Sequence, residues 1–532
     1  MQVFHFHREH IPQVNTQHLN LVYNQEVFLP YIEQTFSLEH FEKQIDLKEK
    51  SYSNANRQVL SNALVNQYKN VSENDEILKN IELLKKENTF TVTTGHQLSL
   101  FTGPMYFVVK ILHVIKLTEA LKVKYPEQNF IPVYWMASED HDFEEIQSMN
   151  LFNRKFTWES AQVGPVGRFK LDGLEKVKED IREMFKNHPG AEINDLLDAY
   201  DGVNLTEATR NLVHFLFKKF GLIIIDGDDA QLKRLFIPIA KKELERSFSY
   251  NEVSKTNHKL EKDGAKIQVH AREINLFYLL DGLRNRIIKK DNLFEIEGVG
   301  TFSLSELLTE LEEYPERFSP NVILRPLYQE LILPNLAYIG GVGEISYWLQ
   351  LKGVFDAVKC TYPLIGVRNS VVWVDSSTSS KMKKINLKLA DIFKSKDQLK
   401  KTYVKQNDNG TLDFSLLEER INEAKSELNK LVLGVDPKME GFAIAESKKL
   451  DKQLETLKSK LIKVSKSKHD TALKQIDQII DKLFPASSLQ ERVSNFFTFS
   501  PDGQFSSRID KMYSKLDPVQ NDLLILREID FK

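Results

Sequence analysis

The stretch that decides the fold is residues 89–138, which begins TFTVTTGHQLSLFTGPMYFVVKIL and ends FIPVYWMAS. Residues 89–94 are rich in β-branched side chains and run into Gly95, as a strand does where it enters a loop. The next segment has Pro104 in its first turn and apolar residues on one side, which predicts a helix. Residues 130–138 are almost continuously apolar, which is typical of a strand buried on both faces. Strand, helix and strand at this spacing predict a βαβ unit.

The same pattern returns further along the chain. Residues 222–226, LIIID, read as another buried strand. Residues 336–351 again suggest a strand, a glycine loop and a helix, and residues 363–375 supply one more strand. We therefore expect an α/β, Rossmann-like core that closes near Asp375 and spans residues 1–375.

Two stretches interrupt this order and are predicted to be insertions. Residues 150–200 contain short β-like pieces and a charged helix. Residues 247–318 alternate short strands with turns such as DGLRN and KKDN. Both stretches would therefore be inserted between strands and helices of the core.

Residues 376–495 are predicted to form a helical arm. A turn at residues 434–441, GVDPKMEG, separates two stretches with the apolar spacing of coiled-coil seams. A helical hairpin buries one seam against the other and leaves a face for a second copy of the chain. The residues of the two seams are Leu417, Ile421, Ala424, Leu428 and Leu431, and Leu450, Leu454, Leu457, Leu461 and Val464.

The last segment of the chain, residues 496–532, is expected to pack back on the core.

Composition limits the classes of partner. In 532 residues the formal net charge is −3, so no global positive field favours nucleic acid or an anionic membrane. We found no signal-peptide pattern and no apolar run long enough to span a bilayer. The single cysteine, Cys360, excludes an intramolecular disulfide and is typical of a reducing compartment. We expect a cytoplasmic protein that binds neither nucleic acid nor membrane.

The first candidate site is the loop that follows residues 89–94. Its glycines let backbone amides approach a ligand, and its side chains add hydrogen-bond donors for a phosphate or carboxylate. An ordinary strand-to-helix loop with a threonine cap explains the same residues equally well. The candidates are Thr94, Gly95, His96, Gln97, Thr102, Gly103, Pro104 and Tyr106.

The second candidate site follows the next strand, where Ser138 precedes Glu139, Asp140, His141 and Asp142. The carboxyl ends of parallel strands meet at one crevice, so this segment is expected to face the first loop. Carboxylates beside an imidazole suit an ammonium ligand or acid and base catalysis. The alternative is structural, because Asp142 and Glu145 have the spacing of a helix capping box. A single histidine does not make a zinc site, and no metal is predicted.

The third candidate site is the glycine loop formed by Gly340, Gly341 and Gly343 together with Glu344. It again joins a strand to a helix and can cradle a nucleotide or an amino acid, with Glu344 binding a cation or ribose hydroxyls. A tight turn is the alternative explanation for the glycines.

Three long blocks of the sequence resemble a known family. They are residues 94–112, 132–146 and 325–351, and they occur in that order ahead of the coiled-coil arm. Together they resemble the bacillithiol biosynthesis cysteine-adding enzymes, the BshC family, over essentially the whole chain. The resemblance implies a core related to class I synthetases and nucleotidyltransferases, two connecting-peptide insertions and a homodimer formed through the arm. A glutamine is expected at position 96 in this family, so His96 is not assigned as an essential base.

The resemblance also implies a reaction, in which L-cysteine is joined to the amine of glucosaminyl malate. The cysteine carboxyl then needs activation, for which ATP or another nucleotide is expected. Residues 139–142 would bind the cysteine ammonium or deprotonate the attacking amine. Arg325 and Tyr328 would bind the malate carboxylates, although an ion pair with a core acid explains Arg325 equally well. The alternatives are a synthetase-like adenylating enzyme for another amino acid or amine, and a non-catalytic nucleotide-binding protein that works through its coiled coil.

Overall fold

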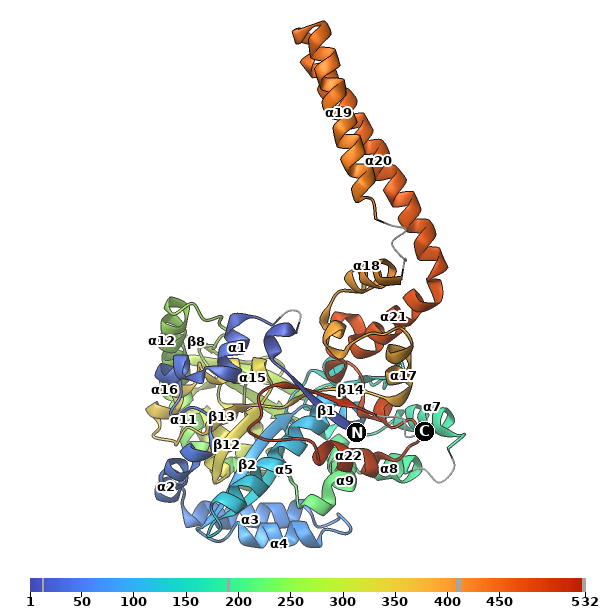
Figure 1. The fold of residues 1–532 in the computed structure, drawn as a ribbon. Coiled ribbons are helices and arrows are strands. Elements are labelled where there is room, and N and C mark those ends of the chain that lie inside the picture. Colours follow the sequence, from blue (N-terminus) through green and yellow to red (C-terminus); the bar gives the residue numbers. More distant parts are fainter. Residues whose placement is uncertain (12–13, 189–191, 408–412, 529–532) are drawn as a thin grey trace. The chain divides into compact units, whose positions relative to one another are not determined.

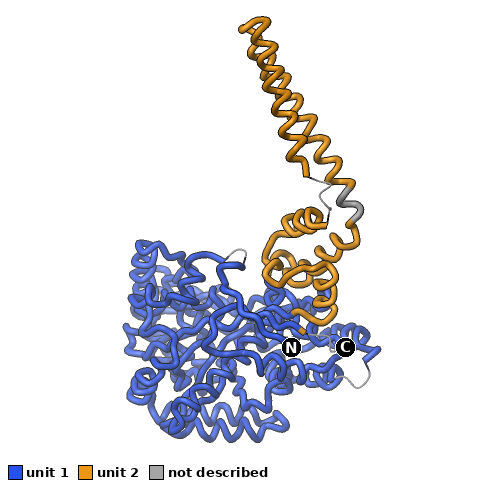
Figure 2. Tube along the Cα trace, in the orientation of Figure 1, with its two compact units in different colours: residues 1–373, 489–527 blue, residues 374–488, 528–532 orange. Residues whose placement is uncertain are grey.

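The computed structural model describes residues 1–11, 14–188, 192–407 and 413–528 (Figure 1). The chain divides into two compact units (Figure 2). Unit 1 contains residues 1–373 and 489–527, and unit 2 contains residues 374–488 and 528–532. Parts of the predicted first insertion, residues 189–191, and of the predicted tail, residues 529–532, lie outside the described residues.

Unit 1 is built on a five-stranded parallel sheet with the order β13-β12-β2-β3-β6. Strands β2 and β3 are joined by the long helix α5, Tyr106–Lys124, which crosses over the sheet and contacts both strands. This is the predicted βαβ unit, and the Rossmann-like fold class is confirmed. The strands are β2 (Thr89–His96), β3 (Asn129–Met136), β6 (Ile223–Asp226), β12 (Asn335–Gly340) and β13 (Leu364–Val367).

Helices cover this sheet and account for the continuous apolar runs in its strands. Helix α2 (Phe41–Ser51) contacts β12, whereas α3 (Asn54–Gln67), α4 (Asp75–Leu83) and α9 (Leu205–Phe217) contact β6. Every residue of β2 except His96 is buried, as expected for a strand covered on both faces.

The loop between β2 and α5 differs from its prediction at Pro104. Helix α5 begins at Tyr106, so Pro104 lies before the helix and not in its first turn. The cause is an unusual loop conformation, with positive φ angles at Thr102 (71°) and Gly103 (64°). The buried Asn495 side chain fixes it by donating to the carbonyl oxygens of Phe101 and Gly103, both at 2.7 Å.

The two interrupting stretches have structures of their own. The first contains the hairpin β4 (Ser148–Leu151) and β5 (Arg154–Thr157), followed by α7 (Leu174–Phe185) and α8 (Ile193–Ala199). The second contains an antiparallel sheet with the order β10-β9-β8-β7-β11. Its strands are β7 (Leu276–Leu280), β8 (Leu283–Lys290), β9 (Leu293–Ile296), β10 (Gly300–Ser303) and β11 (Phe318–Pro320), with α13 (Leu304–Glu313) between the last two.

The start of the second stretch was predicted as short strands and is instead a helix, α12, Phe248–Lys262. Its buried residues are Phe248, Ser249, Val253, Thr256 and Leu260. This spacing of three and four residues is the period of a helix face, and it differs from the two-residue alternation of apolar and polar side chains in a strand.

The strand predicted over residues 363–375 is two strands in two different sheets. Strand β13 ends at Val367, and β14 (Ser370–Val374) joins a second sheet with the order β1-β15-β14. The break falls at Asn369, whose side chain donates to the carbonyl oxygens of Asp517 and Gln520, both at 2.9 Å. Strands β1 (Gln2–Phe6) and β15 (Leu523–Arg527) pair antiparallel, so the first and the last strand of the chain both belong to unit 1.

The predicted arm ended at residue 495, but unit 2 ends its main segment at residue 488. Glu491 is buried in unit 1, where its carboxylate accepts from Ser370 Oγ at 2.6 Å and from the Val371 amide at 2.8 Å. These hydrogen bonds to β14 attach residues 489–495 to the core. Residues 489–495, which were predicted as the end of the arm, thus group with unit 1 by these contacts, because a seam pattern shows where a helix packs and not where the chain rejoins the core.

Unit 2 contains the coiled-coil hairpin. Helices α19 (Ser415–Val435) and α20 (Glu440–Lys468) pack against each other, and α21 (Asp470–Leu483) follows. Of the ten predicted seam residues only Leu454 is buried, whereas Leu417, Ala424, Leu431, Leu457, Leu461 and Val464 are exposed, so the predicted seams match the packed faces only in part. Ala443 and Leu454 are buried, whereas Leu431 and Leu457 are 65% and 45% exposed. The hairpin thus buries only part of its apolar surface. Among the described residues, no helix combines the length and the hydropathy that a membrane span requires.

Candidate functional site

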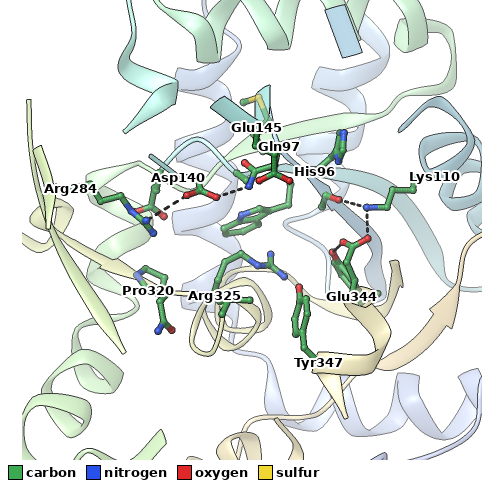
Figure 3. Close-up of a pocket in the computed structure, with 18 of the residues that line it drawn as sticks. His96, Gln97, Lys110, Asp140, Glu145, Arg284, Pro320, Arg325, Glu344 and Tyr347 are labelled. Carbon is green, nitrogen blue, oxygen red and sulfur yellow. Dashed lines mark hydrogen bonds and ion pairs between the residues drawn. The ribbon is translucent and has the colours of Figure 1, made fainter. Parts of the chain in front are cut away.

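A cavity of about 410 Å³ lies at the carboxyl ends of β2, β3 and β12 (Figure 3). Strands β3 and β6 extend the sheet on one side of β2, and β12 and β13 extend it on the other. The boundary between β2 and β12 is therefore the point at which the strand order reverses, where parallel sheets bind ligands. The charged side chains that line the cavity are Lys110, Glu139, Asp140, Glu145, Arg284, Arg325 and Glu344.

The structure brings part of the predicted site together. The predicted residues that line the cavity are Gly95, His96, Gln97, Tyr106, Glu139, Asp140, Arg325 and Glu344. Predicted residues outside this lining are Thr94, Thr102, Gly103, Pro104, Ser138, His141, Asp142, Tyr328, Gly340, Gly341 and Gly343. Three of the latter are occupied elsewhere: Thr94 donates to the Ile339 carbonyl at 2.7 Å, Tyr328 to the Gly227 carbonyl at 2.8 Å, and Ser138 to Asp226.

One end of the cavity contains a buried ion pair between Lys110 of α5 and Glu344 of α15 (Val342–Trp348), with Nζ and Oε2 2.6 Å apart. Lys110 is 2% exposed and also donates to the Gly95 carbonyl at 2.8 Å. The Glu344 carboxylate accepts further from the Gly341 amide and from Tyr338. Burial alone would raise the pKa of Glu344, but the Lys110 charge and these donors lower it overall. The Glu344 charge is therefore neutralised by a cation of the protein itself, and its role toward a ligand stays a prediction.

The opposite end of the cavity is organised around Asp140. Its carboxylate accepts from Gln97 Nε2 at 2.5 Å and from the His141 amide at 2.8 Å, and lies 3.6 Å from Arg284 Nη1. Burial would raise the pKa of Asp140, but the hydrogen bonds from His141 and Gln97 and the Arg284 charge outweigh it and lower the pKa below its usual range. Arg284 comes from β8, so the antiparallel sheet supplies one wall of the cavity.

The remaining residues of the acidic segment have structural contacts. Glu139 pairs with the fully buried Lys233, which also donates to the Phe318 carbonyl. Asp142 caps the short helix α6 (Phe143–Ile146) by accepting from the Glu145 amide at 3.2 Å, as the capping interpretation predicted. His141 is half exposed, and its Nδ1 accepts from Arg284 Nη1 at 2.7 Å. The catalytic roles predicted for residues 139–142 stay predictions.

His96 is a neutral residue of this cavity. Burial, reinforced by the Lys110 charge, lowers the pKa of His96 to about 3. Its ring lies against Tyr106 and Phe107, with centroid distances of 5.2 and 5.0 Å. Neutral His96 can thus donate one hydrogen bond and accept another near neutral pH, as a glutamine can, but it does not take up a second proton there.

Arg325 begins helix α14, Arg325–Ile332, and its guanidinium lies in the middle of the view in Figure 3. Its Nη1 donates to Gln329 Oε1 at 3.0 Å, and its carbon Cζ is 5.6 Å from the centre of the Tyr338 ring. Within the described ranges, no carboxylate lies at ion-pair distance from Arg325, which leaves its charge for a ligand.

Four buried polar atoms of this cavity have no hydrogen-bond partner in the described structure. They are His96 Nε2, Gln97 Oε1, Arg284 Nε and Arg325 Nη2. Nearly all buried polar atoms in proteins are paired, so unmatched donors and acceptors around one cavity indicate a polar ligand. The two arginine donors suit carboxylate or phosphate oxygens.

Several residues of this cavity were missed by the sequence analysis, two of them cations. Lys110 lies off the apolar stripe of its helix, a position that ordinarily faces water. Arg284 follows the turn that was recognised in the second insertion, but its distance of more than 140 residues from Asp140 gave no signal of contact.

The fold and cavity define a Rossmann-like α/β protein with a polar ligand site at its switch point and a coiled-coil appendage. The chain belongs to the BshC family: residues 7–369 match "Bacillithiol biosynthesis BshC, N-terminal Rossmann-like domain" and residues 371–528 match "Bacillithiol biosynthesis BshC, C-terminal coiled-coil domain". These matches confirm the family resemblance seen in the sequence.

Relatives in several bacteria match most of this chain. A Flavobacterium johnsoniae protein named "Putative cysteine ligase BshC" is 45% identical over 473 residues, covering 87% of this chain and 88% of its own length. Proteins of the same name from Cytophaga hutchinsonii and Bacillus anthracis are 41% and 29% identical. They cover 89% and 85% of this chain, and 89% and 86% of their own lengths.

Proposed function

We propose that the protein is a cysteine ligase, which joins the carboxyl group of L-cysteine to the amine of glucosaminyl malate in the last step of bacillithiol synthesis. The family membership and the names of the relatives support the ligase class. The observation that supports a small polar substrate most directly is the cavity with its four unmatched polar atoms.

The two arginines are the proposed carboxylate receptors. Arg325 Nη2 and Arg284 Nε are both buried without a partner on the cavity wall. A cysteine and a glucosaminyl malate together bring three carboxylates, one of which reacts. Charge-assisted hydrogen bonds from guanidinium groups would hold and orient them. Tyr328, predicted for this role, is replaced by Arg284, because the Tyr328 hydroxyl is buried against the Gly227 carbonyl.

An amide does not form appreciably from a carboxylate and an ammonium in water, so the proposal includes a cosubstrate, ATP or another nucleoside triphosphate, that activates the cysteine carboxyl. The unmatched arginine donors fit phosphate as well as carboxylate. Lys110 does not serve as a free phosphate ligand in this arrangement, because Glu344 already neutralises it.

The arm supports a homodimer. Leu431, Leu457, Leu461 and Val464 are between 43% and 65% exposed on the hairpin, and a second copy of the chain would cover them. Leu454 is buried within the hairpin and does not belong to this surface. The free Cys360 agrees with a reducing compartment, and we propose that the protein works in the cytoplasm.

The test is the thiol profile of a strain that lacks the gene. The proposal predicts that bacillithiol disappears and glucosaminyl malate accumulates, and that the wild-type gene restores the thiol while Arg325→Ala does not. Bacillithiol that persists in the deletion strain would contradict the ligase function. Purified Arg325→Ala should still fold, with only a modest loss of melting temperature, since it loses the hydrogen bond to Gln329 but no carboxylate partner of the described chain.

A further inference from the structure

Four carboxyl groups line the cavity, and three of them are already bound by the protein. Asp140 accepts from Gln97 and the His141 amide and faces Arg284. Glu139 pairs with Lys233, and Glu344 pairs with Lys110. A carboxylate whose lone pairs are occupied by protein donors is a poor acceptor for a substrate proton, because those donors stabilise its charged form.

The fourth carboxyl group, that of Glu145, is not occupied. Glu145 lies on the short helix α6, and Asp142 caps this helix through the Glu145 amide and leaves the Glu145 carboxylate outside the capping contact. In the described ranges of the chain, that carboxylate makes no hydrogen bond and no ion pair. Figure 3 shows Glu145 among the side chains that line the cavity.

The surroundings of Glu145 favour proton uptake. Partial burial, reinforced by the negative charges of Asp142 and Asp140, raises the pKa of Glu145 above its ordinary value. Among the described residues, Tyr106 of α5 also interacts with Glu145. Burial is the main cause that raises the pKa of Tyr106 to about 12, so Tyr106 stays neutral. Glu145 is also exposed, so a proton taken from the cavity can pass to water.

We propose that Glu145 is the general base of the ligation, which removes the proton from the amine that attacks the activated cysteine carboxyl. The inference rests on the proposed function, in which a nucleoside triphosphate supplies the activation. The amine nitrogen forms a C–N bond with the carboxyl carbon, the bond from that carbon to the activating group breaks, and the nitrogen proton passes to a Glu145 oxygen. Asp140, which was predicted for this role, would instead hold Gln97 and Arg284 in position.

The neighbouring Glu144 provides a matched control. It is an exposed glutamate on the same helix, one residue away, and it does not line the cavity. Glu144→Gln and Glu145→Gln therefore remove the same charge from the same helix, and only the second removes a carboxylate from the cavity.

The experiment compares steady-state ligation by the wild type, Glu145→Gln and Glu144→Gln between pH 7 and pH 9, with tryptophan fluorescence melting curves as the check of folding. General bases contribute about 10²–10⁴-fold, so Glu145→Gln should lower kcat at pH 7 at least 100-fold with an unchanged KM for cysteine. This loss should shrink toward pH 9, where more of the substrate amine is already free, and Glu144→Gln should match the wild type.

Three results would overturn the inference. If kcat of Glu145→Gln stays within threefold of that of Glu144→Gln, the amine does not need this carboxylate and the ligase function stands. If the KM for cysteine rises while kcat is unchanged, Glu145 binds the cysteine ammonium and is not a base. If wild-type protein forms no product with any nucleotide, the proposed function fails and the role of Glu145 fails with it.

Discussion

The buried pair of Lys110 and Glu344 allows a quantitative prediction. Glu344→Gln keeps the shape of the side chain and removes its charge, leaving the Lys110 ammonium with the Gly95 carbonyl as its partner. Removing one member of a buried ion pair costs about 3–5 kcal/mol. Because the Glu344 side chain is 28% exposed, water can partly compensate, and we expect the lower end, about 3 kcal/mol of unfolding free energy.

Removing the other partner of the ion pair should lower the free energy of unfolding by a smaller amount. Lys110→Met leaves the Glu344 carboxylate with the Gly341 amide, at 2.8 Å, and the Tyr338 hydroxyl, at 2.7 Å. We expect a loss of about 2 kcal/mol, the size of one hydrogen bond to a charged group. The double variant, Lys110→Met with Glu344→Gln, buries no unpaired charge and should cost less than Glu344→Gln alone.

Urea unfolding followed by tryptophan fluorescence measures these differences. All four tryptophans, Trp135, Trp158, Trp348 and Trp373, belong to unit 1, so the signal reports the unit that contains the ion pair. If the loss in the double variant equals the sum of the two single losses within about 0.5 kcal/mol, the two residues are not coupled and this account of the site is wrong.

Three further outcomes are expected. Replacing the exposed Leu457 and Leu461 by glutamate should convert a dimer to monomers by light scattering with unchanged helix content, and a dimer that survives would remove this face from the interface. Burial raises the pKa of Asp226 to about 6, so this carboxyl group holds a proton more tightly in the folded protein than in the unfolded chain. The stability that the protonated group contributes is fully present below about pH 4 and is lost as the pH rises through 6. Asp226→Asn should therefore gain urea midpoint relative to wild type between pH 4.5 and pH 7.5, and an equal difference at both pH values would contradict this assignment. Asn495→Ala should cost about 2–3 kcal/mol, because it leaves two buried carbonyl groups unpaired, and an unchanged midpoint would show that it does not anchor the loop.

The sequence predicted the architecture of the core well because its signals are local. The apolar run of β3 and the apolar spacing of α5 each lie within one element, and the helical period of α19 and α20 repeats over many residues, although most of the seam residues it predicted are exposed. The same local logic failed at residues 363–375, where Asn369 turns the chain from one sheet into another. That turn depends on carbonyl groups of Asp517 and Gln520, about 150 residues away.

The candidate site was predicted in its location and only partly in its members. The carboxyl ends of β2 and β3 were expected to meet, and Gln97 and Asp140 do meet there. Which polar residues face the cavity depends on partners from distant segments: Arg284 reaches Asp140 from the antiparallel sheet, and Lys110 neutralises Glu344. Glu145 was considered only as part of a capping box, yet only its backbone amide takes part in the cap, and its carboxylate does not. A local sequence pattern does not show whether a residue acts through its backbone or through its side chain.

Reconstitution of the reaction tests the central claim most directly. Purified protein is incubated with isotopically labelled L-cysteine, glucosaminyl malate and each nucleoside triphosphate in turn. The products are separated and identified by mass spectrometry. The account predicts bacillithiol that contains the label, in the presence of one nucleotide, from wild-type protein and not from Arg325→Ala. Absence of labelled bacillithiol with every nucleotide, or its formation at the wild-type rate by Arg325→Ala, would contradict it.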